Sequence, residues 1–110
     1  FDCDSFARQS LYSLMDNLGE LQEDHNPELV VEGIVINQFN SQARLPGELV
    51  AELEEEGYPV FDTYLTTSVK MKESHREHRP LIDMAPSHKL TGQFLDLHAE
   101  LEKTRAKAAA

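Results

Sequence analysis

A run of aliphatic and β-branched residues from Leu29 to Phe39 is the feature that most constrains the fold, and it ends abruptly in amide side chains. A nearly continuous apolar run of this length is typical of a strand buried on both faces of a parallel sheet. Open α/β sheets bind ligands at the carboxyl ends of such strands. The run therefore predicts a central parallel strand with a binding site near residues 37–40.

Apolar residues at helical spacing lie on both sides of this run. The first stripe predicts an amphipathic helix that begins near Ser5, with Asp4 or Ser5 as its cap, and ends before Pro27. A second helix is expected after the run, with Pro46 in its first turn and its end at Gly57. The stripes consist of Ala7, Leu11, Leu14, Leu18 and Leu21 in the first helix and of Leu49, Val50 and Leu53 in the second.

The second half of the chain predicts shorter elements. Residues 58–61 indicate a short strand, near a sheet edge because it contains a proline. Thr66, Thr67 and Ser68 offer cap hydroxyls for a short helix that runs through about His75, and residues 80–83 resemble a further extended piece. Ser87 is expected to cap a last helix, which dissolves into residues 104–110, a frayed tail or a remnant of expression. The stripe of that helix is Leu90, Phe94, Leu97 and Leu101.

This order of helices and strands indicates a parallel α/β sheet with right-handed crossovers. Two or three strands make a thin sheet, so we expect unpaired strand edges that pair with another copy or with sequence outside this chain. The chain begins at Phe1 without an initiator methionine. A processed or truncated fragment of a larger sheet is therefore the simpler explanation.

Charge is distributed unevenly along the chain. The net charge is −10, with −12 in residues 1–65 and +2 in residues 66–110. The basic residues of the second part are concentrated in Lys70, Lys72, Arg76 and Arg79. These residues indicate either a local basic surface on an acidic body or an ordinary solvated helix face.

The remaining composition excludes several classes of function. The chain has no apolar run near the roughly 20 residues that cross a bilayer, and no basic leader before an apolar segment. Its single cysteine, Cys3, excludes an internal disulfide and is compatible with a reducing cytosol. The five glycines form neither GxGxxG nor GxxxxGK[ST], so nucleotide chemistry would need residues that this chain does not contain.

Several segments resemble, in the family's order, the C-terminal part of ParA/MinD-type partition ATPases, and the similarity runs from about Asp4 to Leu101. The resemblance implies an α/β fold in which residues 1–103 form the C-terminal portion of a doubly wound, mainly parallel sheet with helices on both faces. The matching segments are Glu32–Asn37, the loop with Arg44, Ser68–His75, Arg79–Ile82 and Pro86–Lys89.

The resemblance also implies a function for the parent protein. Such a protein would be a cytoplasmic, nucleoid-associated bacterial ATPase that forms a homodimer around ATP and Mg²⁺ and binds DNA nonspecifically. It would act with a ParB-like centromere-binding protein in chromosome or plasmid partition. The family's two-lysine phosphate loop, switch aspartate and Walker B strand lie upstream of Phe1. Because phosphoryl transfer depends on positioning and charge stabilisation of the phosphates, we expect this chain alone to be inactive.

Three residues correspond to the family's adenine side. Asn37 lies at the end of the strand beside the base, where its amide can donate to and accept from the base edge. The alternative is that Asn37 only caps a strand-to-loop turn, as asparagine commonly does. Leu65 and Thr66 fall in the loop that packs over the base, although the proline and arginine common there are missing.

Two residues correspond to the family's DNA surface. Lys70 matches a DNA-contacting position of the family directly. The family's usual arginine position is occupied here by Gln42, and Arg44 lies two residues after it. Phosphate contacts require only positive charge within reach.

We expect no metal site in this chain. A spacing of three between His75 and His78 on a polar helix end is common, and no second pair of ligands is evident. An alternative function is a noncatalytic α/β protein-interaction module. A receiver-like version would need an aspartate at the end of the central strand, where this chain has Asn37.

Overall fold

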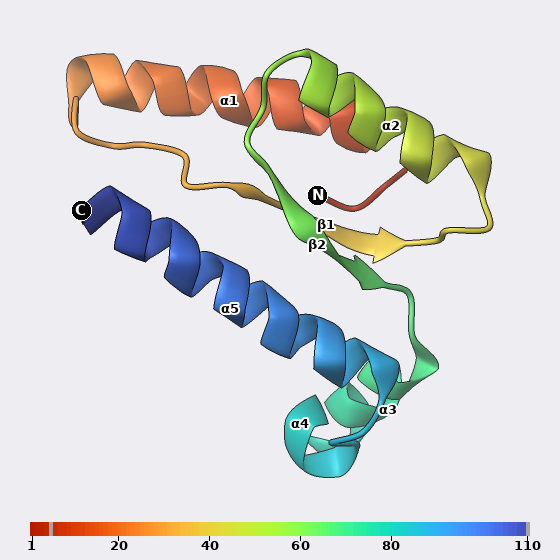
Figure 1. Ribbon diagram of the computed structural model, residues 1–110. Helices are drawn as coiled ribbons and strands as arrows, with labels where there is room; N and C mark the ends of the chain where they lie inside the picture. The colour runs from red at the N-terminus through yellow and green to blue at the C-terminus, as the bar shows by residue number, and fades with distance from the viewer. Residues whose placement is uncertain (5, 110) are drawn as a thin grey trace.

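The protein is an α/β fold, described here from a computed structural model that covers residues 1–4 and 6–109 (Figure 1). The strands β1 and β2 pair in parallel and form a two-stranded sheet within the described residues. The sequence prediction of parallel strands joined by a helix is therefore confirmed. The elements are α1 (Ala7–Asp24), β1 (Ile34–Phe39), α2 (Arg44–Glu55), β2 (Val60–Thr66), α3 (Val69–Glu77), α4 (Leu81–Met84) and α5 (Lys89–Ala109).

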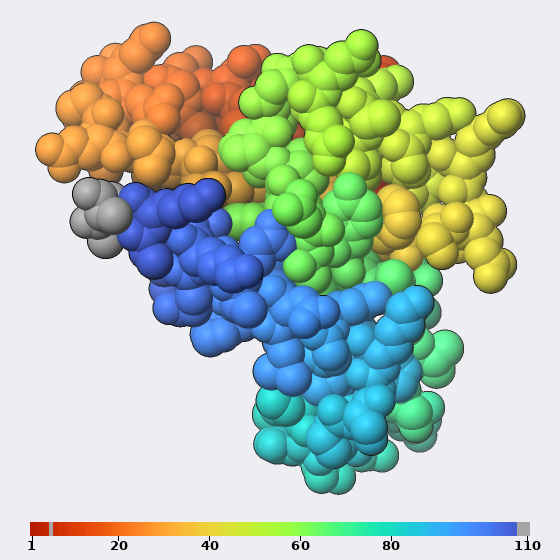
Figure 2. Space-filling model, viewed as in Figure 1, coloured from red at the N-terminus to blue at the C-terminus, as the bar shows by residue number. Residues whose placement is uncertain are grey.

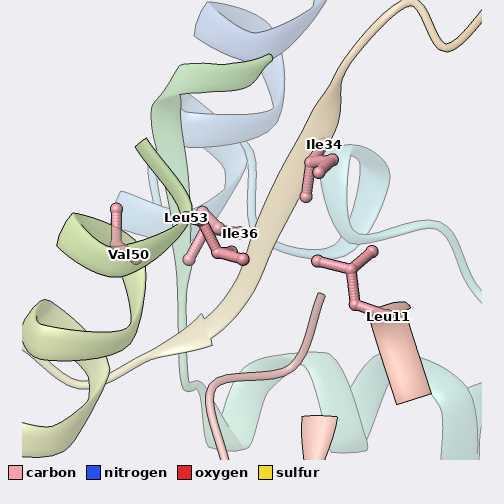
Figure 3. Close-up of a cluster of buried hydrophobic side chains, with 5 residues drawn as sticks. All are labelled: Leu11, Ile34, Ile36, Val50 and Leu53. Carbon is pink, nitrogen blue, oxygen red and sulfur yellow. The ribbon is translucent and has the colours of Figure 1, made fainter. Parts of the chain in front are cut away.

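Helices cover both faces of the sheet. The helices α1 and α2 lie on one face and α5 on the other, while α3 and α4 gather at one end of the molecule (Figure 1). Each face has its own apolar core. The first core contains Leu11, Ile34, Ile36, Val50 and Leu53 (Figure 3). The second contains Phe61, Leu65, Leu81, Leu90 and Leu97.

Strand β1 has neighbours on both of its sides. Its register with β2 pairs Ile34 with Val60 and Phe39 with Thr66. On the other side, a parallel bridge joins Asp2 to Asn37. The amide of Asn37 donates to the carbonyl of Phe1 at 2.8 Å, and the amino group of Phe1 donates to the carbonyl of Val35 at 2.8 Å. Strand β1 therefore has β2 on one side and the segment Phe1–Asp2 on the other.

The structure moves the start of the first strand and decides between the two candidate caps of the first helix. Residues 29–33 belong to no strand, because the ladder with β2 begins only at Ile34, and Val30 is 75% exposed. At the start of α1, the Asp4 carboxylate accepts the amides of Phe6 at 2.9 Å and Ala7 at 2.8 Å. Asp4 therefore acts as the cap, and the alternative, Ser5, lies outside the described residues.

Helix α2 begins and ends close to the predicted positions. It starts at Arg44, which places the buried Pro46 in its first turn. At its end Gly57 has φ 86, and its amide donates to the carbonyl of Glu54 while that of Tyr58 donates to Leu53. This pair of hydrogen bonds is the Schellman arrangement, which needs a left-handed residue at the glycine position.

Three predictions for the second half were wrong. Strand β2 extends to Thr66 rather than ending at Phe61. Residues 81–84 form the short helix α4 instead of an extended piece, with the amide of Met84 bonded to the carbonyl of Pro80. Helix α5 continues to Ala109, past the end of its apolar stripe, since alanine and lysine are good helix formers.

Capping at the last two long helices also differs in part from the prediction. Of the three candidate caps for α3, Ser68 is the one that acts, because its hydroxyl accepts the amide of Lys70 at 3.1 Å. At the start of α5, His88 takes the role predicted for Ser87, because its Nδ1 accepts the amide of Leu90 at 3.0 Å.

The apolar stripe of α1 is only partly covered. Leu11 is buried against β1, whereas Leu14 is 53% and Leu21 is 45% exposed. A helix with such an apolar face normally packs it against another element. The described part of the chain therefore leaves about half of each of these two side chains exposed.

Gly33 permits the close approach of Phe61 to the backbone just before β1. A Cβ at Gly33 would overlap two ring atoms of Phe61, which is itself buried. We predict that Gly33→Ala lowers the free energy of unfolding by about 1–3 kcal/mol, because the packed ring cannot move away freely. Chemical denaturation measures this change.

Gly19→Ala is the matched control. A Cβ at Gly19, inside α1, meets no atom within 4 Å. This variant should raise the free energy of unfolding by roughly 0.5–1 kcal/mol, since alanine is the better helix former. Equal effects of the two substitutions would contradict the role assigned to Phe61.

Candidate functional site

A cavity of about 860 Å³ lies at the carboxyl ends of β1 and β2. Parallel strands end at the same edge of a sheet, so residues far apart in sequence meet there. The cavity brings together all three residues predicted for the adenine side. Its lining includes Asn37, Gln38, Leu65, Thr66, Lys72 and His75.

The side chain of Asn37 is held by a residue that the sequence reasoning missed. Its Nδ2 donates to the Asp2 carboxylate at 2.9 Å, so its orientation is set by the neighbouring segment of the sheet. This contact fixes Nδ2 as a donor and leaves Oδ1 as the acceptor of the amide. The half-buried Asn37 therefore presents an acceptor at the end of β1.

The backbone next to Asn37 is unusual. Gln38 has φ 52 inside β1, and the register between β1 and β2 shifts between Ile36 and Phe39. A residue other than glycine in this left-handed region is uncommon and costs conformational energy. Such a bulge redirects side chains at a strand end, which is typical of binding sites.

Helix α5 positions Thr66 at the edge of the cavity. Both the amide and the hydroxyl of Thr66 donate to the Gln93 side-chain oxygen, at 2.9 and 3.1 Å. The preceding Leu65 is buried and contributes to the core under the cavity. The two residues therefore face different environments, with Leu65 packed inward and Thr66 fixed by hydrogen bonds.

The same helix closes the free edge of β2. The Glu100 carboxylate accepts the amides of Asp62 at 2.7 Å and Thr63 at 2.9 Å. Partial burial opposes ionisation of Glu100, but these hydrogen bonds and the charge of Lys103 together outweigh it and lower its pKa below the usual range. An edge whose amides are occupied in this way cannot accept another strand there.

The two residues predicted to contact DNA lie outside the cavity. Arg44 begins α2, where its side chain is 92% exposed and lies 3.6 Å from Glu48. Lys70 is in the first turn of α3 and lies 3.0 Å from Glu73. Both side chains are therefore exposed at the starts of helices near the carboxyl edge of the sheet, and each lies beside an acidic residue.

A smaller hollow of about 390 Å³ joins the loops that precede these two helices. It is lined by Gln42 from the loop before α2, by Ser68 from the loop before α3 and by Lys89 from α5. The loops leading to Arg44 and Lys70 therefore border one polar surface.

Comparison with known proteins gives partial similarity to partition proteins. The chain is 28% identical over 104 residues to the chromosome partitioning protein ParA of Myxococcus xanthus, covering 92% of this chain and 36% of that protein. It is 22% identical over 100 residues to the sporulation initiation inhibitor protein Soj of Bacillus subtilis, covering 90% and 40%. An uncharacterized protein of Mycobacterium tuberculosis is 29% identical over 86 residues, covering 77% and 27%.

These similarities are weak but extend over most of the chain. The chain spans two-fifths or less of the length of these curated relatives. No protein-family model matches it. None of the helices in the described residues has the length and apolar character needed to cross a membrane. Within the same residues, no group of three or more histidine, cysteine or acidic side chains is arranged to hold a metal ion.

Sequence reasoning missed Asp2, Gln93 and Glu100, which hold the site together. Each acts on a residue at least 27 positions away. Gln93 and Glu100 are separated by two turns of α5, which is the spacing of side chains on one helix face. The spacing of these two polar residues beside the apolar stripe was the only sequence pattern that could have indicated Gln93 and Glu100.

We predict that Glu100→Gln lowers the free energy of unfolding by about 1 kcal/mol at pH 7, because the amide accepts the β2 hydrogen bonds more weakly than a carboxylate. A group whose pKa is lowered by folding stabilises above its unfolded pKa, and this contribution is lost as pH falls through the folded pKa. The difference between wild type and variant should therefore shrink below about pH 4.5, the ordinary value for this group.

Thermal unfolding between neutral pH and pH 3 measures this change. Glu102→Gln is the matched control, since Glu102 lies on the same helix in an exposed ion pair with Arg105. Exposed pairs contribute little, so its effect should stay within about 0.5 kcal/mol. A pH-independent effect of Glu100→Gln would contradict a charged acceptor at the β2 edge.

Proposed function

We propose that this chain is the C-terminal part of a ParA-type partition ATPase, and that the cavity at the carboxyl ends of β1 and β2 receives the adenine of ATP. The observation that carries the proposal is that Asn37, Leu65 and Thr66, assigned to the adenine side by sequence resemblance, line one cavity. The similarity to the ParA and Soj proteins over 90% or more of the chain supports the same reading.

The chemistry of the cavity suits an adenine ring. Asn37 Oδ1 can accept from the exocyclic amino group of adenine, while one N–H of Nδ2 donates to Asp2 and the other is left for a ring nitrogen of the base. Val35 and Phe94 contribute apolar surface to the lining, against which the faces of a base can pack. The cavity is also larger than a base alone requires, so part of it remains for the sugar.

The phosphates need partners from elsewhere in the parent protein. Among the described lining residues, Lys72 is the one lysine or arginine. The phosphates of ATP and the Mg²⁺ ion would therefore be bound mainly by segments outside this chain. The chain alone is therefore expected to bind adenine nucleotides weakly and to have no ATPase activity, whereas the parent protein would act as a homodimer.

The two edges of the sheet support the proposal that β2 is the last strand of a larger sheet. Glu100 and Gln93 occupy amides along β2, which closes that edge. The edge beside Phe1 and Asp2 is the one at which a doubly wound sheet would continue. Further elements added on that side would also cover Leu14 and Leu21 of α1, which are left exposed here.

We further propose that Arg44 and Lys70 contact DNA phosphates in the parent protein, which would be cytoplasmic and nucleoid-associated. Their present partners, Glu48 and Glu73, form exposed pairs that cost little to break. Two copies in a dimer would double this basic surface, and a ParB-like protein would be the partner in partition.

A noncatalytic interaction module is the second candidate. It is favoured by a second, more apolar hollow between α3 and α5, which adjoins the adenine-side cavity. The two candidates differ in the sequence that precedes Phe1 in the coding region, where the ATPase requires a strand, a glycine-rich lysine loop and a helix. A coding region without these parts would exclude the ATPase.

We predict that Asn37→Ala in the parent protein raises the Kd for ATP and ADP alike by about tenfold, because the loss of one buried hydrogen bond costs roughly 1.4 kcal/mol. The preference for ATP over GTP should shrink together with it, since guanine has a carbonyl in place of the amino group. Isothermal titration calorimetry with each nucleotide measures both effects. Asn40→Ala, in the loop beyond β1, is the control. An unchanged ATP affinity of Asn37→Ala would leave Asn37 as a turn residue only.

We predict that Lys70→Glu in the parent protein weakens ATP-dependent DNA binding about tenfold at all sequences and reduces the salt slope by about one. Fluorescence anisotropy with unrelated duplexes at several salt concentrations measures both quantities. Lys107→Glu, the same charge change in the last turn of α5, should leave both almost unchanged. Equal behaviour of the two variants would remove Lys70 from the DNA surface.

A further inference from the structure

A second hollow of about 840 Å³ lies between α3, α4 and α5, beside the adenine-side cavity, with which it shares Met71, His75 and Phe94. These three helices gather at one end of the molecule, away from α1 and α2 (Figure 1). The space-filling view shows this end as a protrusion beside the body of the protein (Figure 2). We call this hollow the α3–α5 groove; its walls include Met71, Arg79, Ile82, Phe94, Leu95 and His98.

The polar groups at the base of the α3–α5 groove are already satisfied. The Ser74 hydroxyl donates to the carbonyl of Arg79, and the Thr91 hydroxyl donates to the carbonyl of Ala85 at 2.6 Å. Ser74 is 4% and Thr91 is 2% exposed. A ligand would therefore gain apolar contact at the base rather than hydrogen bonds, which argues against a small polar molecule.

The walls of the α3–α5 groove expose large apolar side chains. Ile82 is 51%, Leu95 is 53% and Phe94 is 38% exposed. Ile82 belongs to α4, whereas Phe94 and Leu95 belong to α5, so the apolar surface spans two elements. Clusters of exposed apolar residues around a hollow are typical of interaction sites.

The α3–α5 groove is lined by one charged side chain, Arg79, whereas the chain as a whole is strongly acidic. The chain has 20 acidic residues against 10 lysines and arginines. No carboxylate is among the described lining residues, which include Arg79 and the histidines His75, His78 and His98. His98 has Glu102 at 3.8 Å, whereas Arg79 forms no ion pair within the described part of the chain. The complementary partner is therefore apolar and acidic.

We propose that the α3–α5 groove binds an acidic amphipathic helix of another protein. Such a helix would place apolar side chains at positions i, i+3 or i+4, and i+7 against Phe94, Leu95 and Ile82. Its flanking acidic side chains would lie near Arg79 on the rim. This proposal does not depend on the nucleotide or DNA functions proposed above.

The test uses a synthetic, fluorescein-labelled peptide of about 15 residues with leucines at those helical positions and glutamates between them. We expect saturable binding in fluorescence anisotropy, with a Kd on the order of 10 μM at low salt. A peptide with lysine in place of every glutamate should bind at least about tenfold more weakly. Equal binding of the two peptides would overturn the charge argument.

Two substitutions then locate the binding surface. Arg79→Glu and Leu95→Glu change exposed side chains of the α3–α5 groove, and each should raise the Kd at least about tenfold. Arg76→Glu is the matched control, because Arg76 is exposed on α3 but does not line the groove, and it should change the Kd less than about twofold. Circular dichroism of each variant verifies its fold.

Three outcomes would overturn the proposal. The first is no saturable binding of the glutamate peptide to the wild type. The second is binding that Arg79→Glu and Leu95→Glu leave unchanged, which would place the peptide elsewhere. The third is binding of phosphatidylglycerol vesicles that Leu95→Glu abolishes, in the absence of peptide binding, which would assign the groove to a lipid surface.

Discussion

The parallel pairing of β1 with β2 determines where the other parts of the molecule lie. Parallel strands require a crossover, and α2 supplies it on one face of the sheet, while α5 covers the other. The same pairing places the carboxyl ends of both strands together, so Asn37 and Thr66 line one cavity although they are far apart in sequence. If this pairing were lost, both cores and the cavity would be lost with it.

The parts of the fold that the sequence predicted are those with a local physical cause. Gly57 ends α2 because the chain needs a left-handed residue there, and Ser68 caps α3 through its own hydroxyl. The errors lie where tertiary contacts decide. Residues 29–33 have the composition of a strand but have no ladder partner, and the four residues of α4 are too few to show a helical period.

The candidate site was predictable to the extent that it follows a strand end. Asn37 stands where an apolar strand becomes polar, and this change is visible in the sequence. The residues that hold the site in place are not visible in the same way. Glu100 and Gln93 resemble ordinary surface residues of a helix, because their function depends on the distant β2 amides that they accept. Asp2 acts on Asn37 through a short bridge that no periodicity could indicate.

The uneven distribution of charge in the sequence becomes an uneven distribution in space. The strongly acidic first half forms α1 and α2 on one face of the sheet, whereas the slightly basic second half forms α3, α4 and α5. The adenine-side cavity and the α3–α5 groove, like the smaller hollow beside Gln42 and Lys89, take the lysine or arginine of their lining from this second half. The adenine-side cavity and the α3–α5 groove also share Met71, His75 and Phe94 as lining residues. Any movement of α3 relative to α5 would therefore change the shape of both hollows at once. If the ligands of the two hollows favour different positions of α3, the binding of one ligand changes the affinity for the other.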